Sequence, residues 1–480
     1  MEQLSAQDAS FLYVEHEKVA NHVGGLYLYD QSSIPGGALA FKTILRYLAS
    51  KLHLVPRYRQ RLMEVPGNID HPYWVDDPNF DIEYHVRHMA LPKPGDWRQL
   101  CIQTSRIYDR PLDMDRPLWV YYVIEGLDNV EGVPPGSFAL VTKTHHAMID
   151  GVSGTAMATA LHELDPNTPI GEPEPWVPEH QPDPMELVQR TFFKNLTQPM
   201  NFFRYMAESA PTTARVMAGL QDGSLKLPVA AGDVPRTRFN GNTSRHRVIE
   251  AVSLPLTELK SIKNKVPGAT INDVVLAIGG GALRKYLLDK DELPDKPLIT
   301  LAPISVRPTD AGDAAAAGNA VSGMLVPLGT HIEDPLERLE AVHQAAVDSK
   351  KLTNAVGAKV MTDFTQFIPG ATMGMASRLS AALGLATAGD PIINTVITNV
   401  PGPQVPLYFC GAKLLDQFSL GIVQDGLCLF QGILSYDGKL TLTAMSDREA
   451  MPDPEFYKAC LMAAYEELRD ANAAPASAAS

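Results

Sequence analysis

Cysteine is scarce in this chain, with four among 480 residues. No CxxC pair or metal-ligand spacing joins them, which argues against a disulfide framework and against a cysteine-ligated metal site. We expect four reduced, buried thiols of a cytosolic protein, none of them a nucleophile. They are Cys101, Cys410, Cys428 and Cys460.

Long apolar runs and an excess of positive charge are also missing. No stretch approaches the roughly 18–20 apolar residues of a membrane-spanning helix. The opening MEQLSAQDASF has neither the basic nor the apolar region of a signal peptide, so we expect a cytoplasmic protein. The 41 Lys and Arg residues are outnumbered by 55 Asp and Glu residues, which gives a net charge of −14. This balance argues against a nucleic-acid-binding protein, and an anionic substrate would need a local basic patch.

The length and a proline-rich stretch predict two main domains. Domains usually hold about 100–200 residues, so 480 residues exceed one simple core. Seven prolines with acids between them lie at 166–184, which is typical of an extended linker because proline lacks a backbone donor. We predict an N-terminal domain at 1–165, a linker with connecting helices at 166–240, a C-terminal domain at 241–470 and a disordered tail at 471–480.

Helical and strand-like patterns are mixed in both halves, which indicates an α/β or α+β class. Apolar spacing and cap signals predict helices at 37–54, 96–108, 151–164, 271–290 and 453–469. Alternating or apolar runs predict strands at 25–30, 138–144, 246–256 (leading into a helix) and 297–307, and a hairpin at 432–446 turning at Asp437-Gly438. Residues 185–220 are rich in Phe and Met. They fit either an amphipathic helix packed on the body or an element that touches lipid.

The sharpest chemical signal lies where the strand at 138–144 ends. There the chain reads His145-His146-Ala-Met-Ile-Asp150-Gly151, ahead of the helix expected at 151–164. A side chain at such a turn can project into a cleft, and a histidine can accept and return a proton near neutral pH. The motif therefore predicts a general base at this turn.

Three other interpretations of the motif are weaker. Adjacent histidines diverge on a regular backbone and no HExxH spacing accompanies them, so we expect no metal. Gly151-Val-Ser153-Gly154 is similar to the nucleophile elbow of serine hydrolases, but Thr155 stands where that pattern needs glycine. A purely structural histidine pair beside a helix cap is disfavoured because catalytic residues concentrate at such loops. Acyl transfer by a single base remains.

HHAMIDG resembles the HHxxxDG motif of the chloramphenicol-acetyltransferase-like superfamily. That superfamily includes peptide-synthetase condensation domains, plant alcohol acyltransferases and bacterial wax ester synthase/diacylglycerol acyltransferases. The DFGWG signature of the plant branch is absent. The opening block of this chain departs slightly from the wax ester synthase branch, because Asn21 stands where that branch implies a methionine or similar residue. Further blocks resemble the bacterial wax ester synthase branch in its order: Leu4-Ser5 with Asp8, His22-Val23-Gly24-Gly25, Pro117-Leu118-Trp119, NDVVLA at 272–277, PISVR at 303–307 and NVPGP at 399–403.

The resemblance implies two chloramphenicol-acetyltransferase-like α/β domains with an active-site tunnel between them. It implies an acyl-CoA-dependent O-acyltransferase that esterifies long-chain fatty alcohols and/or diacylglycerol to wax esters and/or triacylglycerol. Acyl-CoA is a substrate, and neither an acyl-enzyme nor a cofactor is expected. The general base falls on His146, support on His145, an orienting or structural role on Asp150, and the turn on Gly151. Because such substrates live in membranes and lipid droplets, we expect peripheral association; the oligomeric state is left open.

The other blocks have both a structural and a functional interpretation. Pro117, Leu118 and Trp119 either fill the core or line an acyl channel, and Asn272 either caps a helix or belongs to the substrate site.

Asn399, Pro401 and Gly402 lie in a rigid turn that the resemblance places beside the substrate site. Two basic clusters either are solvated surface or meet the CoA phosphates. The clusters are Arg57, Arg59 and Arg61, and Lys260, Lys263 and Lys265.

One functional alternative is a condensation- or conjugation-type acyltransferase that takes its acyl group from a carrier protein. A free-standing chain without a carrier-like DSL segment disfavours it. A non-catalytic superfamily member is a third reading, and the intact His146 and Asp150 count against it.

Overall fold

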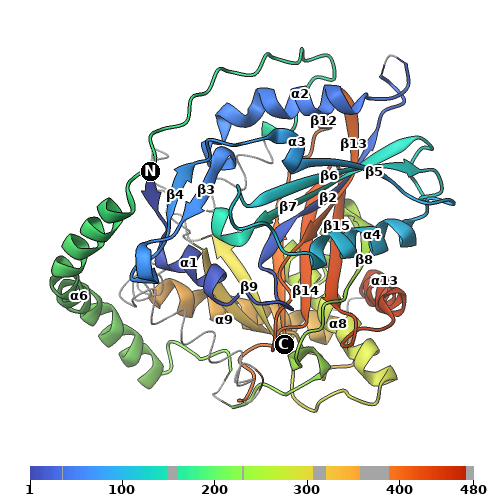
Figure 1. The fold of residues 1–480 in the computed structure, drawn as a ribbon. Helices are drawn as coiled ribbons and strands as arrows, with labels where there is room; N and C mark the ends of the chain where they lie inside the picture. Colours follow the sequence, from blue (N-terminus) through green and yellow to red (C-terminus); the bar gives the residue numbers. More distant parts are fainter. Residues whose placement is uncertain are drawn as a thin grey trace, which may run out of the picture.

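The structure, a computed structural model, describes residues 1–34, 36–149, 160–229, 232–305, 321–356, 387 and 389–471 (Figure 1). Two six-stranded sheets form its centre, with a three-stranded sheet beside the first. Helices accompany both halves, so the α/β class expected from the sequence is confirmed. Asp150, Gly151 and most of the helix expected over 151–164 lie outside the described residues, as do residues 472–480.

The first sheet has the strand order β12-β13-β2-β7-β6-β5. Its strands are β2 (His22–Asp30), β5 (Val86–Ala90), β6 (Trp119–Leu127), β7 (Ser137–His145), β12 (Tyr408–Phe409) and β13 (Ala412–Leu420). Every residue of β7 is buried, because β2 and β6 flank it and buried apolar clusters take up its side chains, one of them shared with the second half. The other elements here are α1 (Ala6–Tyr13), α2 (Phe41–Lys51), α3 (Ile82–His85), α4 (Trp97–Asp109), and the small sheet of β1 (Glu2–Gln3), β3 (Gln60–Met63) and β4 (Tyr73–Asp76).

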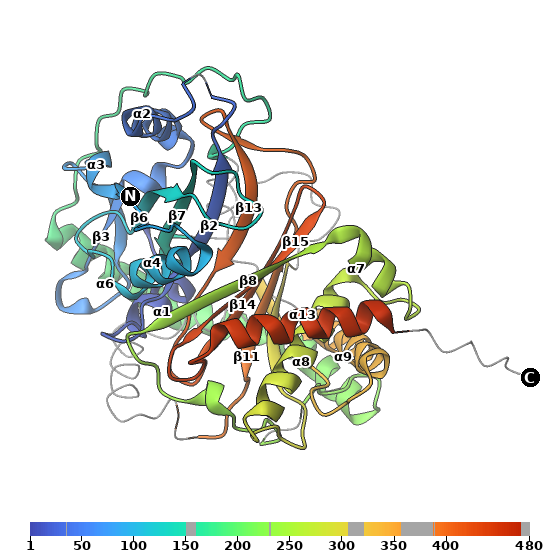
Figure 2. The ribbon, with the colours of Figure 1, turned by 90° about the vertical axis from the view of Figure 1, so that its right-hand side faces the viewer.

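The second sheet has the order β10-β9-β11-β14-β15-β8. Its strands are β8 (Arg247–Pro255), β9 (Ile299–Ser305), β10 (Val321–Pro327), β11 (Thr395–Val400), β14 (Leu429–Tyr436) and β15 (Lys439–Asp447). Four helices gather beside this sheet, toward the C-terminus (Figure 2). They are α7 (Leu256–Lys263), α8 (Ile271–Asp289), α9 (Pro335–Val356) and α13 (Pro454–Asp470), and α8 and α13 bury apolar side chains with the sheet in one core.

Local sequence signals account for most of these boundaries. The predicted helices appear as α2 (followed by a 3-10 turn, Leu52–Leu54), α4, α8 and α13, and the predicted strands as β2, β7, β8 and β9. The predicted hairpin is β14 and β15, whose turn places Asp437 at φ 41° and Gly438 at φ 80°. Helix α8 begins at a capping box in which Thr270 and Asp273 satisfy each other's backbone N–H groups.

The two halves are joined by packing and by strand pairing. A buried apolar cluster places Leu100 and Ile107 of α4 with Ile249 and Ala251 of β8. Strand β13 follows β11 in the sequence yet pairs antiparallel with β2 in the first sheet, an arrangement that no sequence signal predicted. The domain boundaries stay a prediction, and the structure adds the segment 408–420 to the first sheet.

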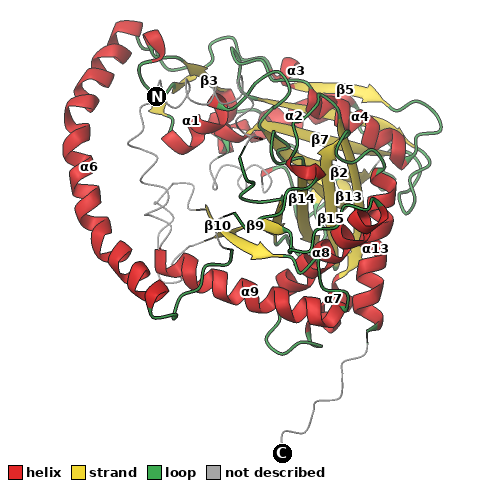
Figure 3. Cartoon of the chain, turned by 90° about the horizontal axis from the view of Figure 1, so that it is seen from below, coloured by secondary structure: helices red, strands yellow, loops and turns green. Residues whose placement is uncertain are grey.

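Helix α6 (Pro184–Gln221) is one continuous 38-residue helix on the outside of the molecule (Figures 1 and 3). This confirms a helix over residues 185–220. Its start is capped by Asp183, and the chain at 166–183, where a linker was predicted, has neither helix nor strand. Within the described ranges, no helix is both long and apolar enough to span a bilayer.

Candidate active site

Backbone hydrogen bonds to the segments on either side hold the end of strand β7 in place. The His145 N–H donates to the carbonyl of Leu118 on one side (2.9 Å), and the His146 N–H donates to the carbonyl of Asn21 on the other (2.8 Å). The strand then turns into a short 3-10 helix, η4 (His146–Met148), against which α1 packs. The predicted strand-end position of the two histidines is therefore correct.

His145 is fully buried and held at both ring nitrogens. Its Nε2 lies 2.6 Å from Oε2 of Glu15, and its Nδ1 accepts the backbone N–H of Ala147 at 3.0 Å. Because a nitrogen that accepts a hydrogen bond must carry a lone pair, the ring is the tautomer protonated on Nε2. His145 is thus a donor to Glu15 and a fixed part of the turn.

His146, in contrast, is only partly buried. Its ring stacks on Phe11 of α1 with ring centroids 3.9 Å apart and planes 20° from parallel. The Nδ1 atom is enclosed and has no hydrogen-bond partner among the described residues. Burial lowers the pKa of His146 to about 4, with its own carbonyl raising the pKa and His145 lowering it. The imidazole is therefore neutral at neutral pH and able to accept a proton.

Buried polar residues lie behind these histidines. His22 pairs with His145 across the strands, and burial holds the pKa of His22 well below its ordinary value. Lys143, also buried, donates through Nζ to the carbonyls of Ile107 (2.8 Å) and Arg110 at the end of α4. Burial lowers the pKa of Lys143 to about 7. These groups tie the end of α4 to the strand that carries the histidines.

Comparisons with known proteins identify the family. Residues 4–275 match the model of the wax ester synthase/diacylglycerol acyltransferase catalytic domain, and residues 317–469 match the model of its C-terminal domain. A protein of Mycobacterium tuberculosis (strain ATCC 25618 / H37Rv), named a probable diacylglycerol O-acyltransferase, tgs2, is 33% identical over 98% of this chain and 99% of its own length. The chain belongs to this family. It is an acyltransferase, as the motifs implied.

Solved structures agree with this assignment. The wax ester synthase/diacylglycerol acyltransferase from Marinobacter aquaeolei VT8 is 28% identical, with a TM-score of 0.66 over 97% of this chain and 98% of that chain. The first condensation domain of the CDA synthetase (14% identical, TM-score 0.54) covers 97% of this chain and 94% of its own, and shares the fold. The two-domain, chloramphenicol-acetyltransferase-like fold is thereby confirmed; the tunnel between the domains stays a prediction.

The PLW block of this acyltransferase lies next to the histidines but inside the core. The carbonyl of Leu118 accepts the His145 N–H, and Leu118 itself is fully buried. Trp119 opens β6 and donates its indole N–H to the carbonyl of Tyr58 at 2.9 Å, with His85 stacked on its ring. Pro117 precedes them. The core interpretation of Leu118 and Trp119 is thus the one their contacts support.

The structure brings Asn272 and Asn399 together, since the Asn399 amide donates to Oδ1 of Asn272 at 3.2 Å. Asn272 is not the cap of α8, because Thr270 holds that position. The Gly402 N–H donates to Oγ of Ser435, and a Cβ on Gly402 would lie 2.2 Å from the Ser435 carbonyl oxygen. Pro401, beside it, is exposed. Within the described part of the chain, no hydrogen bond joins these residues to His146.

Most members of the two basic clusters have structural partners. Arg57 pairs with Glu2, Arg59 lies over the ring of Trp176, and Arg61 donates to Gln181. Lys265 donates to the carbonyls of Leu468, Arg469 and Ala471, which close the end of α13. Lys260 is exposed and Lys263 is partly exposed. These contacts support the interpretation of both clusters as structural or solvated surface.

Two residues near the histidines, one buried and one partly buried, escaped the sequence reasoning. Lys143 had a signal, a lone cation in the apolar run FALVTKT, whereas Glu15 had none because 130 residues separate it from His145. No group of three or more His, Cys, Asp or Glu side chains that could hold a metal ion occurs in the described ranges.

Proposed function

We propose that this acyltransferase moves the acyl group of a long-chain acyl-CoA onto the hydroxyl of a long-chain alcohol and/or of diacylglycerol. The products are wax esters and/or triacylglycerol. The observation that supports this most directly is the neutral, partly buried imidazole of His146 at the end of β7, in a chain whose family carries this activity in its name. His146 is the residue we assign as general base.

The reaction needs one proton carrier. The acceptor hydroxyl gives its proton to His146 as its oxygen attacks the thioester carbonyl, forming a tetrahedral oxyanion. The carbon–sulfur bond then breaks, the ester is released, and the imidazolium returns the proton to the departing CoA thiolate. Because Nδ1 is enclosed, we assign proton transfer to Nε2 of His146. His145 supports the turn, and Asp150 and Gly151 keep the orienting and turn roles that the resemblance implies.

Replacing the base tests this assignment. His146→Ala should lower kcat by about 10²- to 10⁴-fold, the usual contribution of general-base catalysis, without loss of fold. The assay follows thiol release from a long-chain acyl-CoA with hexadecanol or diacylglycerol, and circular dichroism checks folding. His88→Ala, an exposed histidine paired with Glu125, is the matched control and should keep full activity.

Two outcomes would overturn the proposal. A His146→Ala enzyme with most of its activity would remove the base assignment. Turnover with an acyl-carrier protein as donor, and none with acyl-CoA, would favour the condensation- or conjugation-type alternative. A panel of alcohols in the same assay ranks wax ester formation against triacylglycerol formation.

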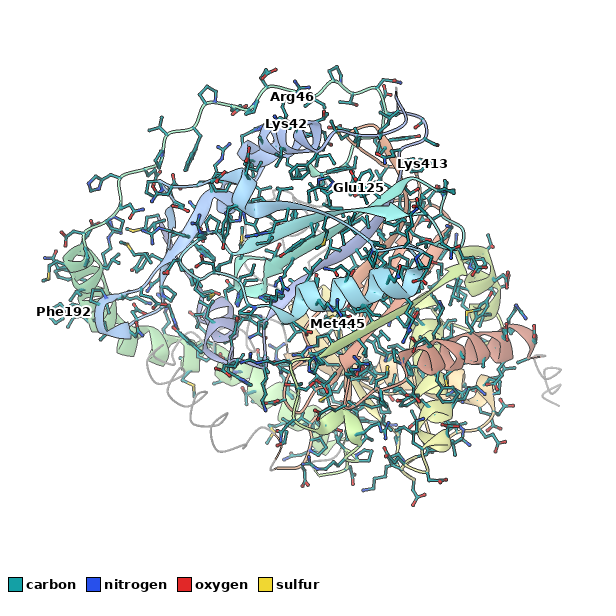
Figure 4. The ribbon with its side chains drawn as sticks, turned by 45° about the vertical axis from the view of Figure 1, so that its right-hand side comes forward. Lys42, Arg46, Glu125, Phe192, Lys413 and Met445 are labelled. Atoms are coloured by element: carbon teal, nitrogen blue, oxygen red, sulfur yellow. The ribbon has the colours of Figure 1, made fainter. Side chains whose placement is uncertain are left out.

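We also propose that helix α6 holds the enzyme at a lipid surface. Its exposed apolar side chains share one face, within an arc of about 140° at 100° per residue. These side chains are Met185, Phe192, Phe193, Leu196, Met200, Met206 and Met217. Phe192 lies at the outer edge of the molecule (Figure 4), and Met200 is 76% exposed. Amphipathic helices of this kind bury their apolar face in the boundary between headgroups and acyl chains.

Charge favours an anionic lipid surface for α6. The helix carries four basic residues, Arg190, Lys194, Arg204 and Arg215, and two acidic ones, so its net charge is +2 in a chain of −14. Basic residues beside an apolar face are attracted to anionic headgroups.

A vesicle assay tests the helix. Phe192→Ser with Phe193→Ser and Leu196→Ser should weaken co-flotation with phosphatidylglycerol/phosphatidylethanolamine vesicles at least about tenfold, since each exposed side chain would lose its burial in lipid. Ile392→Ser is the control, because Ile392 is even more exposed (75%) than the three substituted residues but lies outside α6. Unchanged flotation of the triple variant would refute the role of α6.

A further inference from the structure

Glu15 lies just after helix α1, in the loop that leads to strand β2. It is only 14% exposed, and its Oε2 meets Nε2 of fully buried His145 at 2.6 Å. The distance is that of a short, charge-assisted hydrogen bond. Removing a carboxylate from water costs free energy unless a hydrogen-bond partner compensates, and His145 is that partner for Glu15.

The hydrogen bonds around His145 fix which atoms carry protons. The Ala147 N–H points at Nδ1, so Nδ1 cannot itself be protonated. The ring is therefore neutral, and its single N–H, on Nε2, donates to Glu15. The Glu15 carboxylate accepts from Nε2 of His145, and Nδ1 of His145 accepts the N–H of Ala147. Glu15 is therefore linked through His145 to the residue that follows His146.

The segment that contains Glu15 also contacts His146 directly. Phe11 stacks on the His146 ring, and the Asn21 carbonyl accepts the His146 N–H. Asn21 in turn donates its amide to the carbonyl of Phe11 at 2.6 Å, which closes the segment 11–21 around the turn. Glu15 is the charged member of this segment that reaches the histidine pair.

We propose that Glu15 is a positioning residue for the general base. It accepts the Nε2 hydrogen bond of His145 and so keeps the η4 turn in the conformation that aims His146 at the substrate. The inference rests on the proposed function of His146. What Glu15 supplies is an oxygen atom that accepts the hydrogen bond from Nε2 of His145, and its negative charge is secondary.

Three substitutions separate this role from others. Glu15→Ala should lower kcat about 10- to 100-fold with KM unchanged, since small misplacements of a catalytic group cost that much. Glu15→Gln should stay within about threefold of wild type, because its amide oxygen can still accept from Nε2. Glu15→Asp keeps the charge but is one methylene shorter, so its kcat should fall below that of Glu15→Gln.

Control measurements distinguish a loss of positioning from a loss of fold and from a failure of the proposed function. Glu17→Ala removes a carboxylate two residues away that is 85% exposed and pairs only with Arg245 among the described residues, and it should leave kcat unchanged. Melting temperature and circular dichroism identify any variant that fails to fold. If Glu15→Ala fails to fold, the ratio of the kcat of Glu15→Gln to that of Glu15→Asp tests the inference. Unchanged kcat in Glu15→Ala, or Asp more active than Gln, overturns the inference. A fully active His146→Ala would instead overturn the proposed function.

Discussion

Arg247 joins the two halves of the molecule through one buried guanidinium. Its side chain is 6% exposed and donates to the carbonyls of Ser244 (2.6 Å) and Lys18 (2.6 Å) and to Oδ2 of Asp447 (3.3 Å), which is fully buried. Lys18 belongs to the first half, and Asp447 ends β15 in the second. Arg247→Met would keep the aliphatic bulk and remove all of these donors.

The expected loss in the free energy of unfolding depends on the hydrogen bonds that Asp447 keeps. Breaking a buried ion pair by removing one partner usually costs about 3–5 kcal/mol. Asp447 still receives the backbone N–H and the hydroxyl of Ser244 at 2.7 and 2.8 Å, so the lower end applies. Burial lowers the pKa of Arg247, because desolvation disfavours the charged guanidinium, while Asp109 and Asp447 act in the opposite direction. We therefore expect a loss of about 3 kcal/mol, and a smaller loss when Asp447→Asn accompanies Arg247→Met.

Urea unfolding followed by tryptophan fluorescence measures this loss. Arg245→Met is the matched control two residues away, because Arg245 and Glu17 form an exposed pair (60% and 85%) worth about 0–1 kcal/mol. If Arg247→Met and Arg245→Met shift the unfolding midpoint equally, the buried guanidinium does not hold the halves together and the reasoning fails.

Two further predictions concern packing and pH. A Cβ on Gly24 would lie 2.1 Å from the Thr142 carbonyl oxygen on β7, so Gly24→Ala should sharply lower the melting temperature and the folded yield. Gly389→Ala is the control and should change neither, because a Cβ there would meet nothing within 4 Å. Equal effects of the two substitutions would contradict this prediction. Burial lowers the pKa of His85 to about 4, so the unfolded chain binds the extra proton first as pH falls below about 6.5. Stability is therefore lost on acidification, by about 2 kcal/mol between pH 7 and pH 5. His85→Asn, whose amide can still donate to the Trp119 carbonyl, should reduce that loss in urea titrations at the two pH values, and an unchanged pH dependence would contradict it.

Local patterns in the sequence were enough for much of the fold. Helices α4 and α8 begin at capping boxes built on Asp96 and Thr270, and residue types at such positions are readable without a structure. The hairpin turn at Asp437-Gly438 is equally local. The histidine pair was placed correctly because an apolar strand and a turn signal meet there. Each of these signals spans a few residues.

What the sequence did not predict depends on contacts between distant segments. Alternation in β13 (Ala412–Leu420) indicates a strand with one buried face, but alternation carries no information about which sheet the strand joins. The pairing of β13 with β2 is therefore invisible locally. The same holds for Glu15, an ordinary acid in an acidic chain until the fold brings it to His145.

These distant contacts meet in the short segment that precedes β2. On one side Phe11 and Glu15 hold the histidine pair. On the other side the segment is tied to the second half, through the Lys18 carbonyl to Arg247 and through His16 to Asp425 at 3.3 Å. Because neighbouring residues of one short segment contact the histidine pair and the opposite half, we expect the position of His146 to depend on how the two halves pack. The second half therefore contributes to the placement of the general base that we propose, although the histidine motif itself lies entirely in the first.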